Sequence, residues 1–334
     1  MPFTRTELAL DLIFKYCPDI PFWPQLPRRS ACESMVAQFS ENLPCLRYTN
    51  EGLIVDQRSS DQELEVFYDR LIAGDLEYFK VSKSYAPGFW DFCDRLKGKE
   101  GTRASFLKCH VTGPFTFAAS IKDENGDPLL SNRVLMQAVV KGLTMKALWQ
   151  VKRLREFGRP VIVFIDEPYL GGFGSAYTPV TREDVVKVLA EFTLALKGPQ
   201  TLTGIHCCGN TDWSMLCEAG GPDIINFDAF GFLDRVVLYA GEVKSFLERG
   251  GYLCWGIVPT QGPLPGLNRE LLRHKLDSGI EVFRGKGLGK ELLEKRLLLS
   301  PACGLGSQDA AFAENVFSLL KELSDGLRQS PKNI

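Results

Sequence analysis

The sequence has little that would direct the chain to a membrane, a nucleic acid or an oxidising compartment. Its apolar runs are far shorter than the roughly 20 residues that span a bilayer. The 39 basic and 41 acidic residues nearly balance, and neither sign forms a block that would favour a nucleic acid. Arg5, Glu7, Asp11 and Lys15 interrupt the apolar positions of the first segment, so we expect no secretory signal there. We therefore predict a cytoplasmic protein that binds neither membrane nor nucleic acid.

Histidine is scarce, with 3 residues, whereas the 10 cysteines are numerous and are expected to be reduced in a cytoplasmic chain of this size. His206 and Cys208 lie two residues apart in LTGIHCCGN, at the end of an apolar run, and Cys303 follows another apolar run in LLLSPACGLG. Imidazole and thiolate bind zinc tightly, and three protein ligands leave a fourth position for water or substrate. The pattern predicts a catalytic metal site, although spacing alone also fits a hydrogen-bonded histidine and two core cysteines. Cys207, between the two, is predicted to point to the opposite face.

Short apolar runs that are typical of buried parallel strands alternate with helical patterns along the chain. Eight such units predict a closed (β/α)8 TIM barrel, and a doubly wound open sheet, which has the same alternation, is the alternative. We expect a single domain over residues 1–334, with a helical excursion around 57–100 over the barrel mouth. The predicted strands are 19–25, 45–55, 105–113, 160–168, 202–208, 223–230, 251–259 and 297–304.

Four segments carry a family resemblance, and they occur in the family's order. They resemble the catalytic half of cobalamin-independent methionine synthase, and also the corrinoid:thiol methyltransferases of the uroporphyrinogen decarboxylase superfamily. This resemblance implies a (β/α)8 barrel with an active site at the carboxyl ends of its strands. The segments are VTGPFT (111–116), FIDEP (164–168), HCCGN (206–210) and SPACGLG around Cys303.

The resemblance also implies a zinc ligand set. It assigns His206, Cys208 and Cys303 to the metal, together with a carboxylate that is a glutamate in the methionine synthases. Asp228, in IINFD, stands at that position and is one carbon shorter. Two roles stay open for Asp228: a direct zinc ligand, or a hydrogen-bond partner of a ligating residue.

A zinc site with two cysteine ligands favours chemistry on a thiol. The thiolate is the nucleophilic form of a thiol, and a thiol that coordinates zinc is deprotonated. A hydrolase that uses a metal-bound hydroxide more often has histidine or carboxylate ligands. The ligand set therefore predicts alkylation of a thiol substrate.

Five further residues are candidates for substrate binding. Asp166 and Glu167 are adjacent carboxylates at the end of an apolar strand, which suits either a helix cap with a buried salt bridge or recognition of an amino group. The resemblance implies that Asp166 binds the amine of homocysteine, while Glu167 either shares that role or orients a neighbouring loop. It also places Thr112 and Gly113 at the pocket floor, and Gln25, in WPQLPRR, beside the thiol pocket.

The predicted function is that of a zinc-dependent methyltransferase acting on a small thiol, as in methionine biosynthesis. The resemblance implies homocysteine as the acceptor, and either a methylcorrinoid, carried on a partner protein, or a methyltetrahydrofolate such as 5-methyltetrahydropteroyltriglutamate as the donor. Three alternatives stay open: a corrinoid:thiol methyltransferase with another acceptor, a decarboxylase of the uroporphyrinogen type, and a non-catalytic zinc- or thiol-binding barrel.

Overall fold

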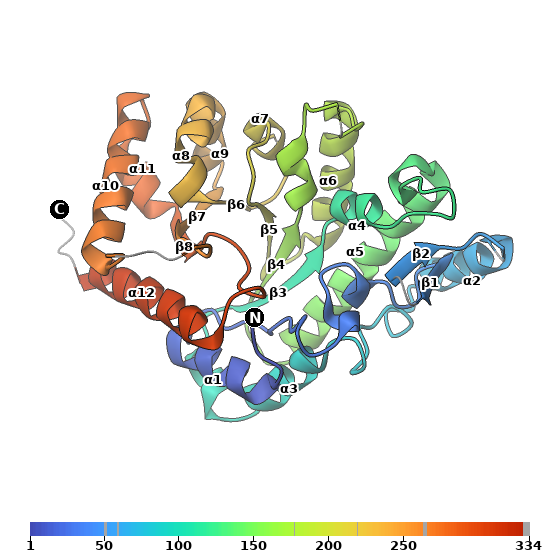
Figure 1. Ribbon diagram of the computed structural model, residues 1–334. Coiled ribbons are helices and arrows are strands. Elements are labelled where there is room, and N and C mark those ends of the chain that lie inside the picture. The colour runs from blue at the N-terminus through green and yellow to red at the C-terminus, as the bar shows by residue number, and fades with distance from the viewer. Residues whose placement is uncertain (50–51, 59, 177, 219, 263–265, 330–334) are drawn as a thin grey trace.

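A curved sheet of six parallel strands occupies the centre of the molecule (Figure 1). The computed structural model describes residues 1–334 except 50–51, 59, 177, 219, 263–265 and 330–334. Each strand pairs with the next one along the chain, so the strand order runs in one direction. The strands are β3 (Leu107–Thr112), β4 (Val161–Asp166), β5 (Thr201–Cys207), β6 (Ile224–Phe227), β7 (Tyr252–Val258) and β8 (Leu297–Pro301).

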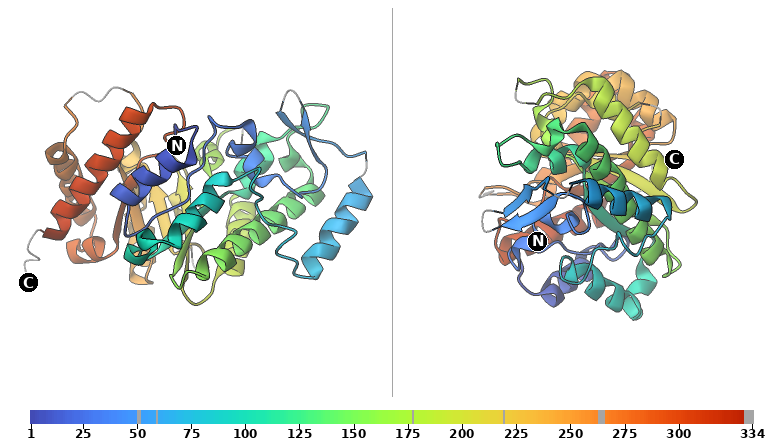
Figure 2. Two further views of the ribbon diagram at one scale, coloured as in Figure 1. Left: turned by 90° about the horizontal axis from the view of Figure 1, so that it is seen from below. Right: turned by 90° about the vertical axis from the view of Figure 1, so that its right-hand side faces the viewer.

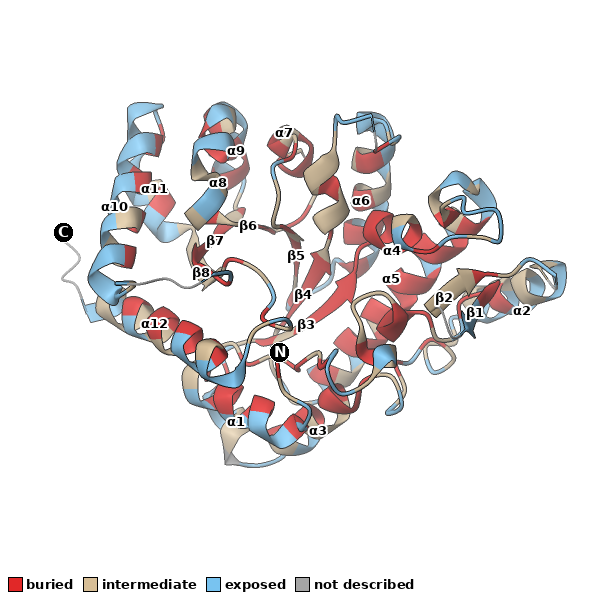
Figure 3. Cartoon of the chain, in the orientation of Figure 1, coloured by how far each residue is buried: buried red, intermediate tan, exposed pale blue. Residues whose placement is uncertain are grey.

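Helices connect these strands and cover the convex face of the sheet, with their inner sides buried and their outer sides exposed (Figure 3). Several of these helices begin at a side-chain cap. The side-chain oxygen of Asn132 accepts hydrogen bonds from two backbone N–H groups in the first turn of α5, and the Thr181 hydroxyl accepts one from the first turn of α6. The helices between strands are α4 (Pro114–Ser120), α5 (Arg133–Arg155), α6 (Arg182–Leu196), α7 (Trp213–Leu216), α8 (Ala229–Val236), α9 (Ala240–Glu248), α10 (Arg269–Gly285) and α11 (Lys290–Lys295).

The prediction of a closed (β/α)8 barrel is wrong. Within the described part of the chain the sheet has six strands and is open, and its one-directional strand order also lacks the reversal of a doubly wound sheet. Six predicted strands match β3 to β8. The other two, residues 19–25 and 45–55, do not become ladder strands, and this leaves a curled half-barrel sheet.

Local sequence explains both failures. Segment 19–25 contains Pro21 and Pro24, which have no N–H to donate to a ladder, and it forms one parallel bridge, between Phe22 and Lys108. Segment 45–55 folds back on itself as an antiparallel hairpin, β1 (Leu46–Thr49) with β2 (Gly52–Val55). Gly52 has a φ of 119°, a backbone conformation that suits glycine, and it starts the returning strand.

The remaining helices lie around the open side and the hairpin. The helices α1 (Thr6–Tyr16) and α12 (Ala310–Gln329), from opposite ends of the chain, lie side by side (Figure 2) and are joined by the Lys15–Glu314 ion pair at 2.9 Å. Residues 57–100 contain α2 (Ser60–Ile72), which contacts the hairpin through Glu63, and α3 (Pro87–Leu96), which packs on α1. Within the described residues, no helix combines the length and apolarity needed to cross a membrane.

The alternation of strand residues gives the sheet two different faces. Val161, Val163 and Ile165 face the helices and belong to the main core, whereas Ile162 and Phe164 belong to a small apolar cluster on the concave face. Asp166 follows Phe164 by two residues and so lies on the same concave face. Its register partner on β5 is His206, whose own partner on β6 is Asn226. The same alternation therefore gathers polar side chains at the carboxyl end of the concave face.

Candidate metal centre

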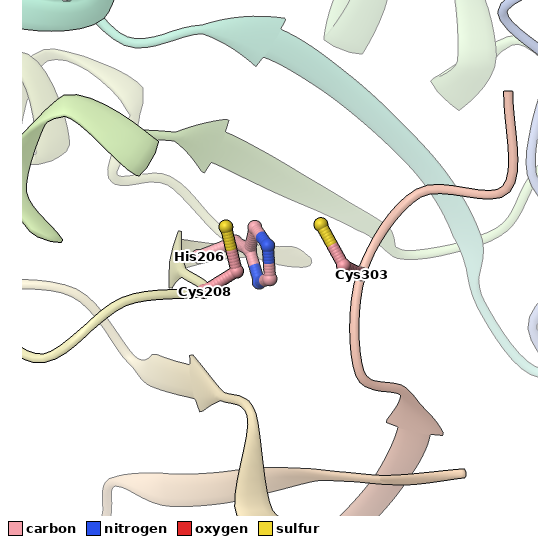
Figure 4. Close-up of side chains that lie close together, drawn as sticks. All are labelled: His206, Cys208 and Cys303. Carbon is pink, nitrogen blue, oxygen red and sulfur yellow. The ribbon is translucent and has the colours of Figure 1, made fainter. Parts of the chain in front are cut away.

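The structure brings His206, Cys208 and Cys303 together at the carboxyl ends of the strands (Figure 4). One ligand atom from each residue lies within 4.8 Å of the others, and among the described residues they form the one such group of His, Cys, Asp and Glu. His206 is near the end of β5, Cys208 follows that strand, and Cys303 lies in the loop after β8. All three are partly buried, so the group is reachable from outside the protein.

Cys303 reaches the group because the loop after β8 folds inward over a glycine. The Ala302 N–H donates to the Val258 carbonyl at 2.8 Å, next to a register shift between Gly256 and Val258 of β7. A Cβ on Gly256 would lie 2.7 Å from the Ala302 Cα, so any other residue at 256 would push the loop outward. The position of Cys303 thus depends on a glycine in the neighbouring strand.

Cys208 is located by a second close approach of backbones. Gly209 directly follows Cys208, and a Cβ on Gly209 would lie 2.8 Å from the Cα of Gly171, in the loop after β4. Cys207 points away: it is fully buried in the main core, and its thiol lies 3.7 Å from the Gly209 carbonyl. The prediction that Cys207 and Cys208 face opposite sides is confirmed.

The two thiols of the group are unequal. The pKa of Cys303 is lowered below that of an ordinary thiol by the neighbouring Cys208 thiol and His206 ring, both of which stabilise its thiolate. The pKa of Cys208 is correspondingly raised by the neighbouring Cys303 and by burial. A metal ligand must be deprotonated, so the lowered pKa of Cys303 favours metal binding, whereas the raised pKa of Cys208 means that a metal would have to displace its proton.

His206 is oriented by Asn226, a residue that the sequence analysis missed. The Nδ1 atom of His206 lies 2.6 Å from the Asn226 Oδ1, which leaves Nε2 for a metal. Asn226 lies opposite His206 in the β5–β6 register and is a single polar residue within the strand IINF. That isolated polarity in a buried strand is the signal that would have found it.

Asp228, for which a direct ligand role and a hydrogen-bonding role beside a ligand are both open, is not part of the group of three. Its side chain is the N-cap of α8, where Oδ1 accepts a hydrogen bond from the Gly231 N–H at 2.8 Å. Burial raises the pKa of this carboxyl, and the Cys303 thiolate raises it further. The Asp228 carboxylate thus lies within electrostatic range of Cys303, and it caps the N-terminus of α8.

Asp166 and Glu167 have different surroundings. Asp166 pairs in register with His206 and faces the centre, and burial raises its pKa against the opposing charges of His206 and Lys108. Glu167 is fully buried at the start of α4, where it accepts hydrogen bonds from the N–H groups of Phe115 and Thr116 and from the Thr116 hydroxyl, at 2.6–2.9 Å. Burial raises the pKa of Glu167 to about 7 despite these donors. Of the two adjacent carboxylates, Asp166 alone is directed at the three ligands.

The other predicted substrate residues are held by protein groups. The Thr112 hydroxyl donates to the Met35 carbonyl, and the Gln25 amide donates to the buried Gln38 at 2.8 Å. Gly113 leaves room for the Glu167 side chain, because a Cβ on Gly113 would lie 2.1 Å from the Glu167 carboxyl carbon. All three are therefore engaged in contacts within the protein.

Comparison with known proteins adds little to this geometry. No protein-family model matches the chain, and no curated protein matches it in sequence. One similar solved structure is that of a candidate vitamin-B12 independent methionine synthase from Listeria monocytogenes, with 13% sequence identity and a TM-score of 0.48 over 75% of this chain and 72% of the other. At this TM-score the likeness carries no conclusion about family or activity.

Proposed function

We propose that the chain is a zinc-dependent methyltransferase whose acceptor is a small thiol. The observation that carries the proposal is the convergence of one imidazole and two thiols, within 4.8 Å of one another, at the partly open carboxyl end of the sheet. Among the described residues no fourth histidine, cysteine, aspartate or glutamate joins the group. The fourth coordination position would therefore be available to a substrate.

The donor set suits zinc. A neutral imidazole with a free Nε2 and two thiols form a Cys2His set, and zinc sites that use three protein ligands are commonly catalytic. The Nδ1 contact to Asn226 and the lowered pKa of Cys303 favour metal binding by two of the three ligands. When bound there, zinc would hold a substrate thiol in its deprotonated, nucleophilic form at neutral pH.

Asp166 supports an amino thiol as the acceptor. Its carboxylate is one strand away from His206, a spacing of about 4.8 Å between strand axes. A small molecule that carries an amine and a thiol a few bonds apart, as homocysteine does, would reach Asp166 and the metal at once. We therefore place the substrate amine at Asp166.

The transfer itself needs little from the protein beyond alignment. The acceptor sulfur forms a bond to the methyl carbon while the bond from that carbon to the donor breaks, and its electron pair leaves with the donor. A corrinoid donor keeps that pair on its own metal, and a methyltetrahydrofolate donor takes up a proton at the leaving nitrogen. The thiol proton has by then gone to solvent. We propose a methylcorrinoid or a methyltetrahydrofolate as the donor class, because both carry a transferable methyl group.

Metal content and metal surroundings test the proposal. Wild-type protein purified without chelators is expected to hold about one zinc per chain, and Cys208→Ser and Cys303→Ser are expected to lose it. Cys207→Ser is the matched control, because the adjacent Cys207 thiol faces the core and should leave the zinc in place. Zinc-edge spectroscopy should show an added sulfur in the metal shell on addition of homocysteine.

Two results would contradict the proposal. Wild-type protein that neither contains zinc nor takes it up on reconstitution would remove its basis. A zinc shell already completed by four protein ligands, and unchanged by any thiol, would instead indicate a structural metal site. The decarboxylase alternative is not favoured, because it gives the two thiols no role.

A further inference from the structure

The Asn226 amide lies at the centre of a hydrogen-bond chain that joins four strands. Its Nδ2 donates to the Cys254 carbonyl at 2.8 Å on β7 and to the Ser300 Oγ at 2.9 Å on β8. Its Oδ1 faces His206 on β5 at 2.6 Å. One side chain on β6 therefore connects the strand that bears His206 with the strand that precedes Cys303.

These contacts leave one orientation for the amide. A carbonyl oxygen only accepts hydrogen bonds, so the atom of Asn226 that faces the Cys254 carbonyl must be the NH2 group. The Oδ1 atom must then face His206, and it too can only accept. It follows that the Nδ1 of His206 carries a hydrogen and that the lone pair of the neutral ring is on Nε2.

We propose that Asn226 is a positioning residue that selects the Nδ1–H tautomer of His206 and so presents Nε2 to the metal. Cys254 and Ser300 fix Asn226, and Asn226 fixes the ring. The tautomer follows from the protein alone, whereas its consequence for zinc rests on the proposed function. Buried partners of this kind typically contribute 10- to 100-fold to metal affinity.

The tautomer can be measured in metal-free protein. The chain has three histidines, His110, His206 and His274, so nitrogen NMR of protein labelled with ¹⁵N-histidine gives three ring systems. At a pH where the His206 ring is neutral, the wild type is expected to show the Nδ1–H form. Asn226→Leu, which keeps the number and branching of the side-chain heavy atoms but removes the acceptor, is expected to lose that preference.

Zinc affinity provides the second measurement, by competition with a chromophoric chelator. Asn226→Leu is expected to bind zinc about 10- to 100-fold more weakly than the wild type. Thr203→Val is the matched control: it removes a buried hydroxyl on β5 that bonds to Asp223 at 3.0 Å, on the face away from His206. It is expected to lower stability while leaving the tautomer and the zinc affinity unchanged.

The outcomes separate this inference from the proposed function. If Asn226→Leu keeps the Nδ1–H tautomer, or binds zinc as tightly as the wild type, Asn226 is not the positioning residue. If zinc fails to bind the wild type, the proposed function fails, and the tautomer measurement still decides the assignment of Asn226. A loss of tautomer preference in Thr203→Val as well would show a general effect of destabilisation and would overturn the inference.

Discussion

At the scale of single residues, neighbouring carboxylates in one motif have separate tasks. Asp166 ends β4 on the concave face and lies beside His206, whereas Glu167 caps α4 from a fully buried position. The alternation of the strand turns them to different surroundings although they are adjacent in sequence. Substitutions of Asp166 and of Glu167 are therefore expected to have different effects.

Substitution of Glu167 is expected to affect stability. In Glu167→Gln the amide NH2 would face a backbone N–H of Phe115 or Thr116, which leaves a buried donor without an acceptor. We expect a loss of about 1–3 kcal/mol in the free energy of unfolding. Denaturant unfolding measures this, and an unchanged midpoint would show that Glu167 does not hold the start of α4.

Substitution of Asp166 is expected to affect substrate binding instead. Asp166→Asn keeps the shape of the side chain but removes the negative charge that would bind an amine. We expect the affinity for homocysteine to fall about 10-fold or more, since hydrogen bonds to charged groups contribute about 1.5–3 kcal/mol. Affinity for a thiol without an amine, such as 2-mercaptoethanol, should stay the same. An equal loss for both thiols would contradict the assignment of the amine to Asp166.

At the scale of elements, two loops are kept together by glycines. Gly209→Ala would place a Cβ 2.8 Å from the Gly171 Cα and move Cys208, which is the preceding residue. Metal ligands tolerate displacements of only about 0.2 Å, so we expect zinc affinity to fall about 10-fold or more. Gly198→Ala, where a Cβ would meet nothing within 4 Å, is the control and should bind zinc normally. Chelator competition compares the two variants.

The long helix α5 contains a buried lysine whose titration is measurable. The Lys146 amine is fully buried, with no hydrogen-bond partner among the described residues, and burial lowers its pKa from 10.5 to about 8 against the attraction of Glu41. Between pH 8 and 10.5 the unfolded chain binds more protons than the folded one. The free energy of unfolding therefore rises with pH through that window, by on the order of 3 kcal/mol from this one group.

Lys146→Met is expected to remove this dependence. The variant should be more stable than the wild type at pH 7, and the difference in the free energy of unfolding should shrink as the pH rises from 8 to 10.5. Lys141→Met, on the same helix but exposed and paired with Glu191, is the control and should show no such change. A difference that is independent of pH would mean that the pKa of Lys146 is the same in the folded and unfolded chains, so that burial does not lower it.

At the scale of the whole molecule, the candidate site joins distant parts of the chain. His206 lies in the third strand of the sheet and Cys208 directly follows that strand, whereas Cys303 lies in the loop after the last strand. Zinc that binds only the folded arrangement stabilises it, by about 2.7 kcal/mol at a free concentration 100 times the Kd. We expect a rise of roughly 3–8 °C in Tm on zinc addition, extrapolated from domains of 150–250 residues. Cys303→Ser should abolish the rise, and Cys207→Ser should keep it.

Much of this architecture could be read from sequence because its causes are local. The apolar runs of β3 to β8 reflect the burial of both faces of the sheet. The alternation of side chains along β5 points Cys207 away from His206 and Cys208. Polar residues at the strand ends marked His206, Cys208, Cys303 and Asp166 as candidates, and the structure brings the first three together with Asp166 in register beside His206. These features depend on a residue and its near neighbours along the chain.

The remaining features were decided by tertiary structure because their causes are partners far away in the chain. Pro21, Pro24 and Gly52 are local signals against ladder pairing, but whether the remaining six strands close or stay open depends on partners far along the chain. Asn226 acquires its role only when the β5–β6 register places it against His206. Cys303 reaches the other ligands only because Gly256 lets a loop approach β7 closely. The sequence alone determined which groups could bind a metal, and the packing of strands and loops determined that three of them meet.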